Sequence, residues 1–439
     1  MNKRIAGILL FAPLLLNSCA TTGSTDTVQD FKYTIRRLQE RLVTNPQDAG
    51  ALRDLGVIYF ESKQYGQARE YLKKSSLANG NDGKTMFYLG MTQEYDQDLN
   101  GALASYLNYM DLPSSSPFRK LMEGRYQAVT RALIAQQFRE LASNEQVLAK
   151  QETPSNAVAV FPLVYEGSDP RFSSLGLGLS EMMTVDLGQV KKLKLVERLR
   201  VDELMDELKF GASSAVDPST APRVGKLLAA GRLVGGRFTV GADNALRLDV
   251  ASLDVVRDKE PTTTTQSDDL DNLFKVQKEI VFDVVKKMGI TLTREEREAI
   301  QRVPTKNLQA FIAYSIGLEK EGQGDFEAAS VYFKQASALD PSFEKAKGKA
   351  EATDAMSASG TSKESALFAA HKISPPPSPS DQDRRGGARA LLTQRFLKLE
   401  MAIQVGFVPG QNSRKAAQEL STLGVLLNSL PLPPPPPGR

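Results

Sequence analysis

The stretch Ala157-Val158-Ala159-Val160-Phe161-Pro162 is a short apolar run that ends at a proline. Its β-branched residues favour a β-strand. An apolar pattern with helical spacing follows at Leu175–Leu187, and two further apolar runs, Leu193–Val196 and Leu233–Val240, repeat the strand signal. Strands separated by helical patterns of about a dozen residues predict βαβ units on a shared sheet. The domain predicted from this pattern spans residues 156–290.

The rest of this domain is predicted from the same kinds of signal. A glycine-containing turn, Gly241–Asn244, lies between two alternating runs and predicts an antiparallel hairpin that ends near Val256. Apolar residues at helical spacing predict three further helices, at 201–208, 221–230 and 274–288. The whole chain is therefore predicted to be α+β, with an α/β-like core between helical segments.

Composition limits the classes of function. The 439 residues carry 55 Lys and Arg against 52 Asp and Glu, so the basic excess that is typical of a dedicated nucleic-acid binder is missing. One Cys excludes an intramolecular disulfide. One His, His371, together with that Cys cannot form a His/Cys zinc site. We expect no metal and no cofactor.

The first 30 residues have the pattern of an export signal. Lys3 and Arg4 precede the apolar run Ile5–Leu16, which is too short to span a bilayer as a mature helix. Leu16, Ser18 and Cys19 resemble the lipobox of bacterial lipoproteins, in which cleavage leaves a lipidated Cys at the new N-terminus. The alternative is an ordinary secretory signal followed by an unrelated Cys. We predict a signal peptide at 1–18 and a tether at 19–30.

The lipobox resemblance also implies a location. Ala20 rather than Asp follows the cysteine, which in such lipoproteins implies delivery to the outer membrane. Acyl chains contribute about 0.8 kcal/mol per buried CH₂ group, so several chains on Cys19 would hold the protein firmly to the membrane. We expect a lipid-anchored protein on the periplasmic face.

An internal repeat occurs at a spacing of 34 residues, with Leu55-Gly56 recurring as Leu89-Gly90 and Ala68 as Ala102. This pattern resembles the tetratricopeptide repeat, a helical hairpin that must stack on neighbours to bury its apolar face. A repeat domain is predicted at 31–150, and a single further repeat with neighbouring helices at 291–355. The residues expected to pack inside the repeats are Leu55, Gly56, Ala68, Leu89, Gly90, Ala102, Gly317, Ala329 and Pro341.

Tetratricopeptide repeats usually offer the inner face of their first helices to partners. Here the residues predicted on that face are Arg53, Phe60, Phe87, Met91, Glu94, Phe311, Tyr314 and Glu321. The alternative is that these aromatic residues pack against the core domain of the same chain. The single repeat predicted at 291–355, called the late repeat below, must dock on another element. The candidates are the helix at 274–288, the helix at 294–302 and the N-terminal repeats.

Four blocks of the core, in order, resemble the CsgG family, named for the curli secretion channel, and also the N-terminal domain of TolB-like proteins. The blocks are Val158–Pro162, Leu175–Ser180, Val196–Arg198 and Gly225–Gly236. The resemblance implies a non-enzymatic lipoprotein and, in founding members, a ring in which each subunit contributes β-hairpins to an outer-membrane channel.

The sequence departs from the channel-forming members. The hairpin Arg237–Val256 alternates, but it carries Arg247, Asp249 and Asp254, and the chain has no Trp. A membrane strand normally presents apolar residues flanked by aromatic residues. A periplasmic domain that does not span the membrane is therefore favoured, with a subunit of an oligomeric secretion channel as the alternative.

Two features could instead indicate a ligand site. Gly176-x-Gly178 at a helix start could cradle a phosphate, but Glu181 stands where a dinucleotide fingerprint has its third glycine. A structural turn is favoured. An acidic cluster could bind a cation or supply carboxylates, although basic neighbours favour a solvated helix face; its residues are Glu197, Asp202, Glu203, Asp206 and Glu207.

The C-terminal region is predicted as a disordered linker at 356–385, a helical hairpin at 386–430 and a polyproline tail at 431–439. The leading hypothesis is a non-enzymatic lipoprotein that scaffolds envelope assembly or export. Its partners would be the membrane through lipidated Cys19 and other envelope proteins or an exported polypeptide, with a homo-oligomer as an option and no nucleic acid. A periplasmic ligand-binding domain is the second alternative.

Overall fold

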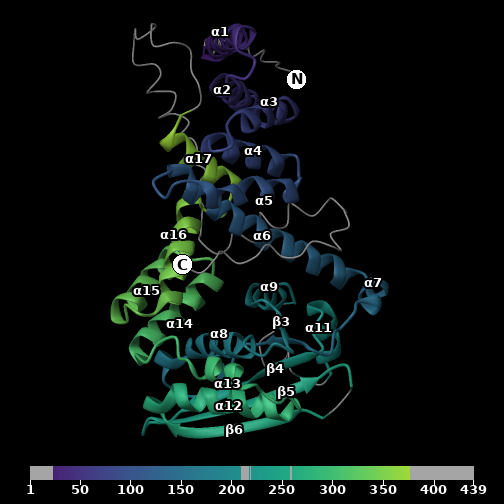
Figure 1. The fold of residues 1–439 in the computed structure, drawn as a ribbon, viewed down its shortest axis with the longest axis vertical. Coiled ribbons are helices and arrows are strands. Elements are labelled where there is room, and N and C mark those ends of the chain that lie inside the picture. The colour runs from purple at the N-terminus through teal and green to yellow at the C-terminus, as the bar shows by residue number, and fades with distance from the viewer. Residues whose placement is uncertain (1–22, 209–216, 218, 258–259, 376–439) are drawn as a thin grey trace, which may run out of the picture.

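A computed structural model describes residues 23–208, 217, 219–257 and 260–375. Helices form an elongated stack at one end of the molecule, and the sheet lies at the other (Figure 1). The stack begins with α1 (Gly23–Thr44), α2 (Ala49–Glu61), α3 (Tyr65–Ala78), α4 (Gly83–Tyr95), α5 (Leu99–Leu107), the 3₁₀ turn η1 (Asn108–Asp111), α6 (Pro117–Ser143) and α7 (Glu145–Lys150).

Side-chain caps define where the repeat helices begin. Asp48, Asp82 and Asp98 each accept a hydrogen bond from a backbone N–H in the first turn of α2, α4 and α5. Helix α1 begins at Gly23, so the predicted tether at 19–30 is wrong for residues 23–30. The signal peptide and Cys19 lie outside the described residues.

The sheet domain follows α7. Its strands are β1 (Ala157–Val160), β2 (Val164–Tyr165), β3 (Lys194–Leu195), β4 (Arg232–Val240), β5 (Ala245–Asp254) and β6 (Thr262–Asp269). Its helices are α8 (Leu175–Leu187), α9 (Arg198–Leu208), α11 (Ala221–Leu228) and α12 (Leu273–Lys287), with 3₁₀ turns η2 (Pro170–Phe172) and η3 (Leu270–Asn272).

The strand order is β3-β1-β4-β5-β6, with β2 also paired to β4. Strand β1 runs parallel to β3 and β4, which confirms the predicted βαβ units. Strands β4 and β5 form the predicted antiparallel hairpin, and β6 extends it antiparallel. Strand β6 was not predicted, because its Thr-rich stretch lacks the apolar alternation of a half-buried strand.

Strand β1 explains why the domain needs a continuous apolar run. Val158 and Val160 point to the face covered by α8 and α12, whereas Ala159 and Phe161 point to the face covered by α9, α11 and α6. A strand buried on both faces cannot alternate apolar with polar residues. The sheet is therefore covered on both faces, and its second layer includes the end of the repeat stack.

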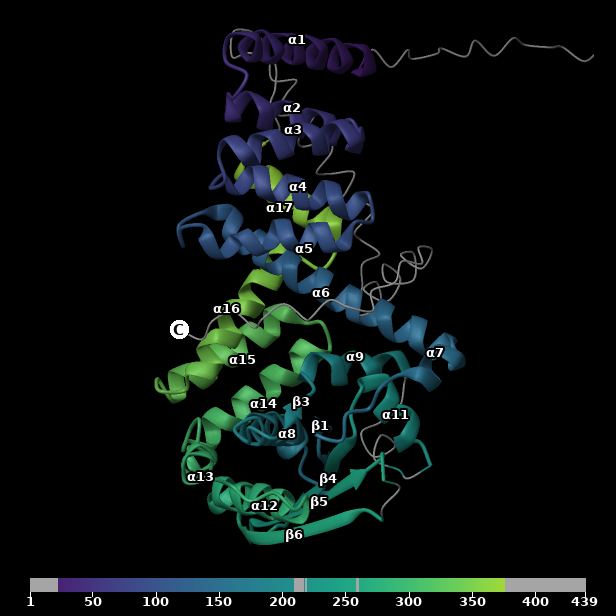
Figure 2. The same cartoon turned by 45° about the vertical axis from the view of Figure 1, so that its right-hand side comes forward.

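The chain then returns to the repeats through α13 (Arg294–Gln301), α14 (Leu308–Gly322), α15 (Phe326–Leu339), α16 (Glu344–Ser359) and α17 (Lys363–Ile373). Helix α14 packs on α8, and α16 packs on α6. The late repeat thus docks on the sheet domain and on the N-terminal stack, and the two groups of repeats form one continuous layer (Figures 1 and 2).

One boundary in this region needs correction. The disordered linker predicted at 356–385 is wrong for residues 356–359, which end α16, and for residues 363–373, which form α17. A capping box between Ser362 and Ser365 starts this helix, and three alanines support it. The predicted helical hairpin at 386–430 and the polyproline tail lie outside the described residues.

Candidate functional site

The inner face of the N-terminal repeats is not open in this structure. Phe60, Phe87, Met91 and Glu94, which were predicted to meet a partner, are at most 4% exposed. Arg53 is partly exposed and forms ion pairs with Asp54 and Asp82 of the same stack. The expectation that these side chains form a free surface is therefore wrong, because other parts of the chain cover them.

Helix α17 is one of the elements that cover this face (Figure 2). Ala366 and Ala370, one turn apart on α17, are fully buried in the same apolar cluster as Phe60 and Phe87. Small residues at this spacing let two helices approach closely. The repeats therefore hold a helix of their own chain where a partner was expected.

Polar contacts fix the direction of α17. Near its beginning, Glu364 accepts a hydrogen bond from the hydroxyl of Tyr95, at the end of α4 (3.5 Å). Beyond its end, Ser374 Oγ accepts a hydrogen bond from Lys84 Nζ, in the first turn of α4 (2.9 Å). Helix α17 thus runs antiparallel to α4.

Two further contacts connect α17 to the rim of the face. His371 Nε2 lies 2.8 Å from Glu61 Oε1, at the end of α2. Arg125 Nη1, on α6, donates to the carbonyl of Thr361 just before α17 (3.1 Å). We call the surface bounded by Glu61, Lys84, Tyr95 and Arg125 the repeat groove. Three N-terminal repeat helices, α2, α4 and α6, contribute to it.

The predicted partner residues of the late repeat are also buried. Phe311 lies against Gly178 of α8 and 5.3 Å from the ring of Phe274 on α12. Tyr314 packs against Phe333 and Phe343. The prediction that these two residues form a free partner surface is therefore wrong. Phe311 instead packs on the core domain, as the alternative interpretation expected.

Glu321 belongs to a charged network where the repeats meet the sheet domain. Its carboxylate accepts from Lys349 Nζ (2.8 Å) and lies 3.5 Å from Arg131, which also pairs with Glu203 of α9. Burial opposes ionisation of Glu321, but the positive charges of Lys349, Arg131 and Arg198 outweigh it and lower its pKa to about 2. This network joins α6, α9, α14 and α16.

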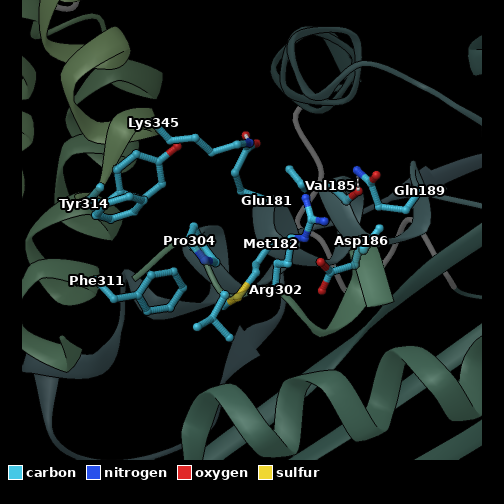
Figure 3. Close-up of a pocket in the computed structure, with 14 residues that line it drawn as sticks. Glu181, Met182, Val185, Asp186, Gln189, Arg302, Pro304, Phe311, Tyr314 and Lys345 are labelled. Atoms are coloured by element: carbon cyan, nitrogen blue, oxygen red, sulfur yellow. Dashed lines mark hydrogen bonds and ion pairs between the residues drawn. The ribbon is translucent and has the colours of Figure 1, made fainter. Parts of the chain in front are cut away.

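A pocket of about 240 Å³ lies beside this network (Figure 3). Tyr314 and Phe311 form one side, and α8 contributes Met182 and two carboxylates. Lys345 donates to Glu181 (3.1 Å), and Lys278 donates to the other carboxylate, Asp186 (2.7 Å).

These ion pairs limit the chemistry of the pocket. Burial opposes ionisation of Glu181, but Lys345 and Arg198 lower its pKa below the usual range. Each of the two carboxylates is thus already paired with a lysine, and they do not form the free acid–base pair that general catalysis needs. The hydroxyl of Tyr314 has no hydrogen-bond partner among the described residues.

The two glycines at the start of α8 serve close packing. A Cβ atom on Gly176 would lie 1.9 Å from the carbonyl oxygen of Leu163, and one on Gly178 would lie 2.1 Å from Ser315 Oγ. The space beside Gly176 is thus occupied by the loop after β1. Gly178 is the point at which the late repeat contacts the sheet domain.

The acidic cluster of the sheet domain forms three ion pairs with basic residues. Arg131 pairs with Glu203, Arg139 with Glu207, and Arg198 with Asp202. Within the described part of the chain, no group of three or more His, Cys, Asp or Glu residues is arranged to hold a metal ion. None of the described helices combines the length and apolar character needed to cross a bilayer.

The residues predicted to pack inside the repeats lie at helix contacts. Gly56 faces Leu72, Gly90 faces the ring of Tyr106, and Gly317 faces the ring of Phe333. Leu55, Ala68, Leu89, Ala102 and Ala329 are buried. The prediction is wrong for Pro341, which is exposed because it lies beyond the end of α15. Small residues occur where two helices of one repeat meet.

The repeat groove and its occupant were missed by sequence reasoning. The signal that could have found α17 is the spacing of Ala366, Ala369 and Ala370, after a serine cap. The neighbouring Pro/Ser-rich stretch concealed it. Lys84 and Arg125 carry no sequence signal, because their roles depend on residues far along the chain.

Comparison with known families agrees with this architecture. Residues 144–244 match the model of the curli production assembly/transport component CsgG. Residues 51–82 and 312–343 match the tetratricopeptide repeat. No curated protein matches the chain. The chain therefore carries a CsgG domain set between tetratricopeptide repeats, and neither of these families is catalytic.

Proposed function

We propose that this protein is a non-enzymatic outer-membrane lipoprotein that faces the periplasm and scaffolds envelope assembly or export. The observation that carries the proposal is the union of the CsgG domain with both groups of repeats. Helix α6 contacts α5 of the repeats, α16 of the late repeat and α9 of the sheet domain. A partner bound to one part is thereby held in a defined position relative to the others.

The membrane attachment in this proposal rests on the sequence. Leu16, Ser18 and Cys19 match the lipobox pattern, and the apolar run before them has the length of a signal-peptide core. The family name, curli production assembly/transport, supports a role at the cell envelope. The lipidated Cys19 would anchor the protein, and the repeats would receive other envelope proteins or an exported polypeptide.

A scaffold agrees better with the β4–β5 hairpin than a subunit of a secretion channel does. Leu246, Leu248 and Val250 of β5 are fully buried in the core of the sheet domain, together with α12. The side chains that alternate with them are exposed or partly exposed and include Arg247 and Asp249. The apolar side chains of this hairpin are thus already used inside the domain.

The test is the location of a Cys19→Ala variant in a bacterial host that processes lipoproteins. The unmodified protein should sediment with the outer membrane, and the variant should be released with the soluble periplasmic contents. Thr21→Ala is the matched control and should remain with the membrane. Sedimentation of the Cys19→Ala variant with the outer membrane would contradict the lipid anchor. Rings seen by electron microscopy of detergent-purified protein would favour the channel instead.

A further inference from the structure

We propose that α17 is an exchangeable occupant of the repeat groove, and that the groove accepts from a partner a short helix with the same small-residue face. The inference rests on the proposed scaffold function and names the surface and the class of partner. It commits to one kind of occupant, a helix of about three turns that runs antiparallel to α4.

The apolar anchoring of α17 is slight. Its two fully buried side chains are alanines, Ala366 and Ala370. The larger apolar residues Leu367 and Phe368 are only partly buried. Tight interfaces usually depend on buried aromatic or Arg anchors, which bury far more surface than a methyl group. A helix of eleven residues is also marginal without tertiary support. Helix α17 can therefore leave at low cost.

The ends of the groove define what a replacement helix must offer. Lys84 lies at the C-terminal end of α17, where it donates to Ser374 Oγ and to the carbonyl of Pro375. A lysine at a helix C-terminus interacts favourably with the carbonyl groups there. At the other end, the Thr361 carbonyl accepts from Arg125. The groove thus recognises both ends of a helix and its direction.

The groove also selects for a donor near the end of the bound helix. Glu61 faces His371, which lies in the last turn of α17. Lys84 is 9% exposed and its amine donates to Ser374 Oγ, and burial lowers the pKa of Lys84. A partner helix with small residues four apart, followed by His, Lys or Arg and then an exposed acceptor, would satisfy the same groups.

The connection to α16 allows α17 to leave without disturbing the rest. Helix α17 contacts both α6 and α16, but α16 also has its own, more extensive contact with α6 and is held there without α17. Gly360, between the two helices, has a φ of +65°, which glycine adopts without strain. The tether keeps α17 near the groove at an effective concentration of about millimolar. A partner helix that is present below this concentration must therefore have a higher affinity for the groove than the α17 sequence has as a free peptide.

The first experiment removes the occupant and supplies it again. The full chain carrying Ala370→Arg should expel α17, because a guanidinium side chain does not fit where the methyl group of Ala370 is fully buried. The probe is a fluorescein-labelled synthetic peptide with the sequence of residues 361–375. The Ala370→Arg chain should bind this peptide at least tenfold more tightly than the unmodified chain. The matched control, Ile373→Arg, adds the same charge at a side chain that is 37% exposed, and should behave as unmodified.

Equal affinity of all three chains for the peptide would overturn the proposal. A second measurement uses the unmodified chain, labelled with ¹⁵N, and an excess of unlabelled peptide. Amide hydrogen exchange should become faster in α17, while exchange in α4 remains slow. If exchange in α17 does not change, or if Ala370→Arg unfolds the repeats, α17 is a fixed part of the fold. Both measurements use purified protein, so a failure of the lipid anchor would leave their results unchanged.

Discussion

Arg125 on α6 holds Glu94 on α4 in a buried ion pair, with Arg125 Nε 3.0 Å from Glu94 Oε1. No more than 5% of either side chain is exposed. The hydroxyl of Tyr106 donates to the same carboxylate (2.7 Å), and Arg125 also donates to the carbonyl of Thr361. One guanidinium therefore connects two repeat helices with the segment that leads into α17.

Glu94→Gln should lower the free energy of unfolding of the chain by about 3–5 kcal/mol, because the substitution leaves a buried charge on Arg125 without its partner. Urea unfolding followed by circular dichroism measures the change. The control is Glu40→Gln, which breaks an exposed pair with Arg36 and should change the free energy by less than about 1 kcal/mol. Equal effects of the two substitutions would show that the buried pair has no special role.

Gly90→Ala should destabilise the N-terminal repeats by about 1–3 kcal/mol, because the added Cβ would lie 2.4 Å from the ring of Tyr106. Gly66 lies in α3 with no atom within 4 Å of an added Cβ. Gly66→Ala should be neutral or stabilising by up to about 1 kcal/mol, since alanine is the better helix former. Thermal unfolding of the two variants compares them. A stable Gly90→Ala variant would mean that α4 and α5 can separate without cost.

Gly124→Ala should weaken the contact between the late repeat and the N-terminal stack. An added Cβ on α6 would lie 2.3 Å from the carbonyl oxygen of Ala355 and 2.2 Å from Ser359 Oγ. Backbone atoms this close cannot move aside as a flexible side chain can. We therefore expect the free energy of unfolding to fall by about 1–3 kcal/mol and hydrogen exchange in α16 to become faster. The control is Gly348→Ala, because Gly348 lies on α16 and an added Cβ there would have no atom within 4 Å. Unchanged exchange in α16 after Gly124→Ala would contradict the close crossing.

Glu321 should make the stability of the chain depend on pH. Its pKa in the folded chain is about 2, below the ordinary value of 4.5 for a glutamate side chain. A lowered pKa contributes stability that is present above pH 4.5 and is lost as the pH falls towards 2, on the order of 3 kcal/mol in total. Glu321→Gln should therefore be less stable than the unmodified chain at pH 7, and the difference should shrink towards pH 3.

Urea unfolding at pH 7, 5 and 3 measures this dependence. Glu298→Gln removes an exposed ion pair with Arg294 and should not change the pH dependence. If the Glu321→Gln variant shows the same difference from the unmodified chain at every pH, the charge of Glu321 does not act through Lys349, Arg131 and Arg198.

The sheet domain could be predicted because its signals are local. The apolar run before Pro162, the periodic helix at 175–187 and the hairpin turn each depend on neighbours in the sequence. The repeats were predicted for the same reason, since their small residues recur at a fixed spacing. Strand β6 was not predicted, because threonines that pair at a sheet edge show no apolar alternation.

The site could not be predicted, because it depends on contacts between distant segments. Lys84 and Ser374 are separated by 290 residues, and no pattern in either neighbourhood refers to the other. Phe87 and Met91 were correctly placed on the repeats, but their exposure depends on helices elsewhere in the chain. Residue periodicity shows which side of a helix is apolar, and it does not show which element covers that side.

The order of the helices along the chain has a consequence for biosynthesis. The groove helices α2, α4 and α6 are complete by Ser143, whereas α17 begins only at Lys363. In an exported chain, as proposed above, the N-terminus leads, so the groove helices emerge before α17. Until α17 follows, the repeats present an empty groove, and any helix that reaches it first will meet no competitor.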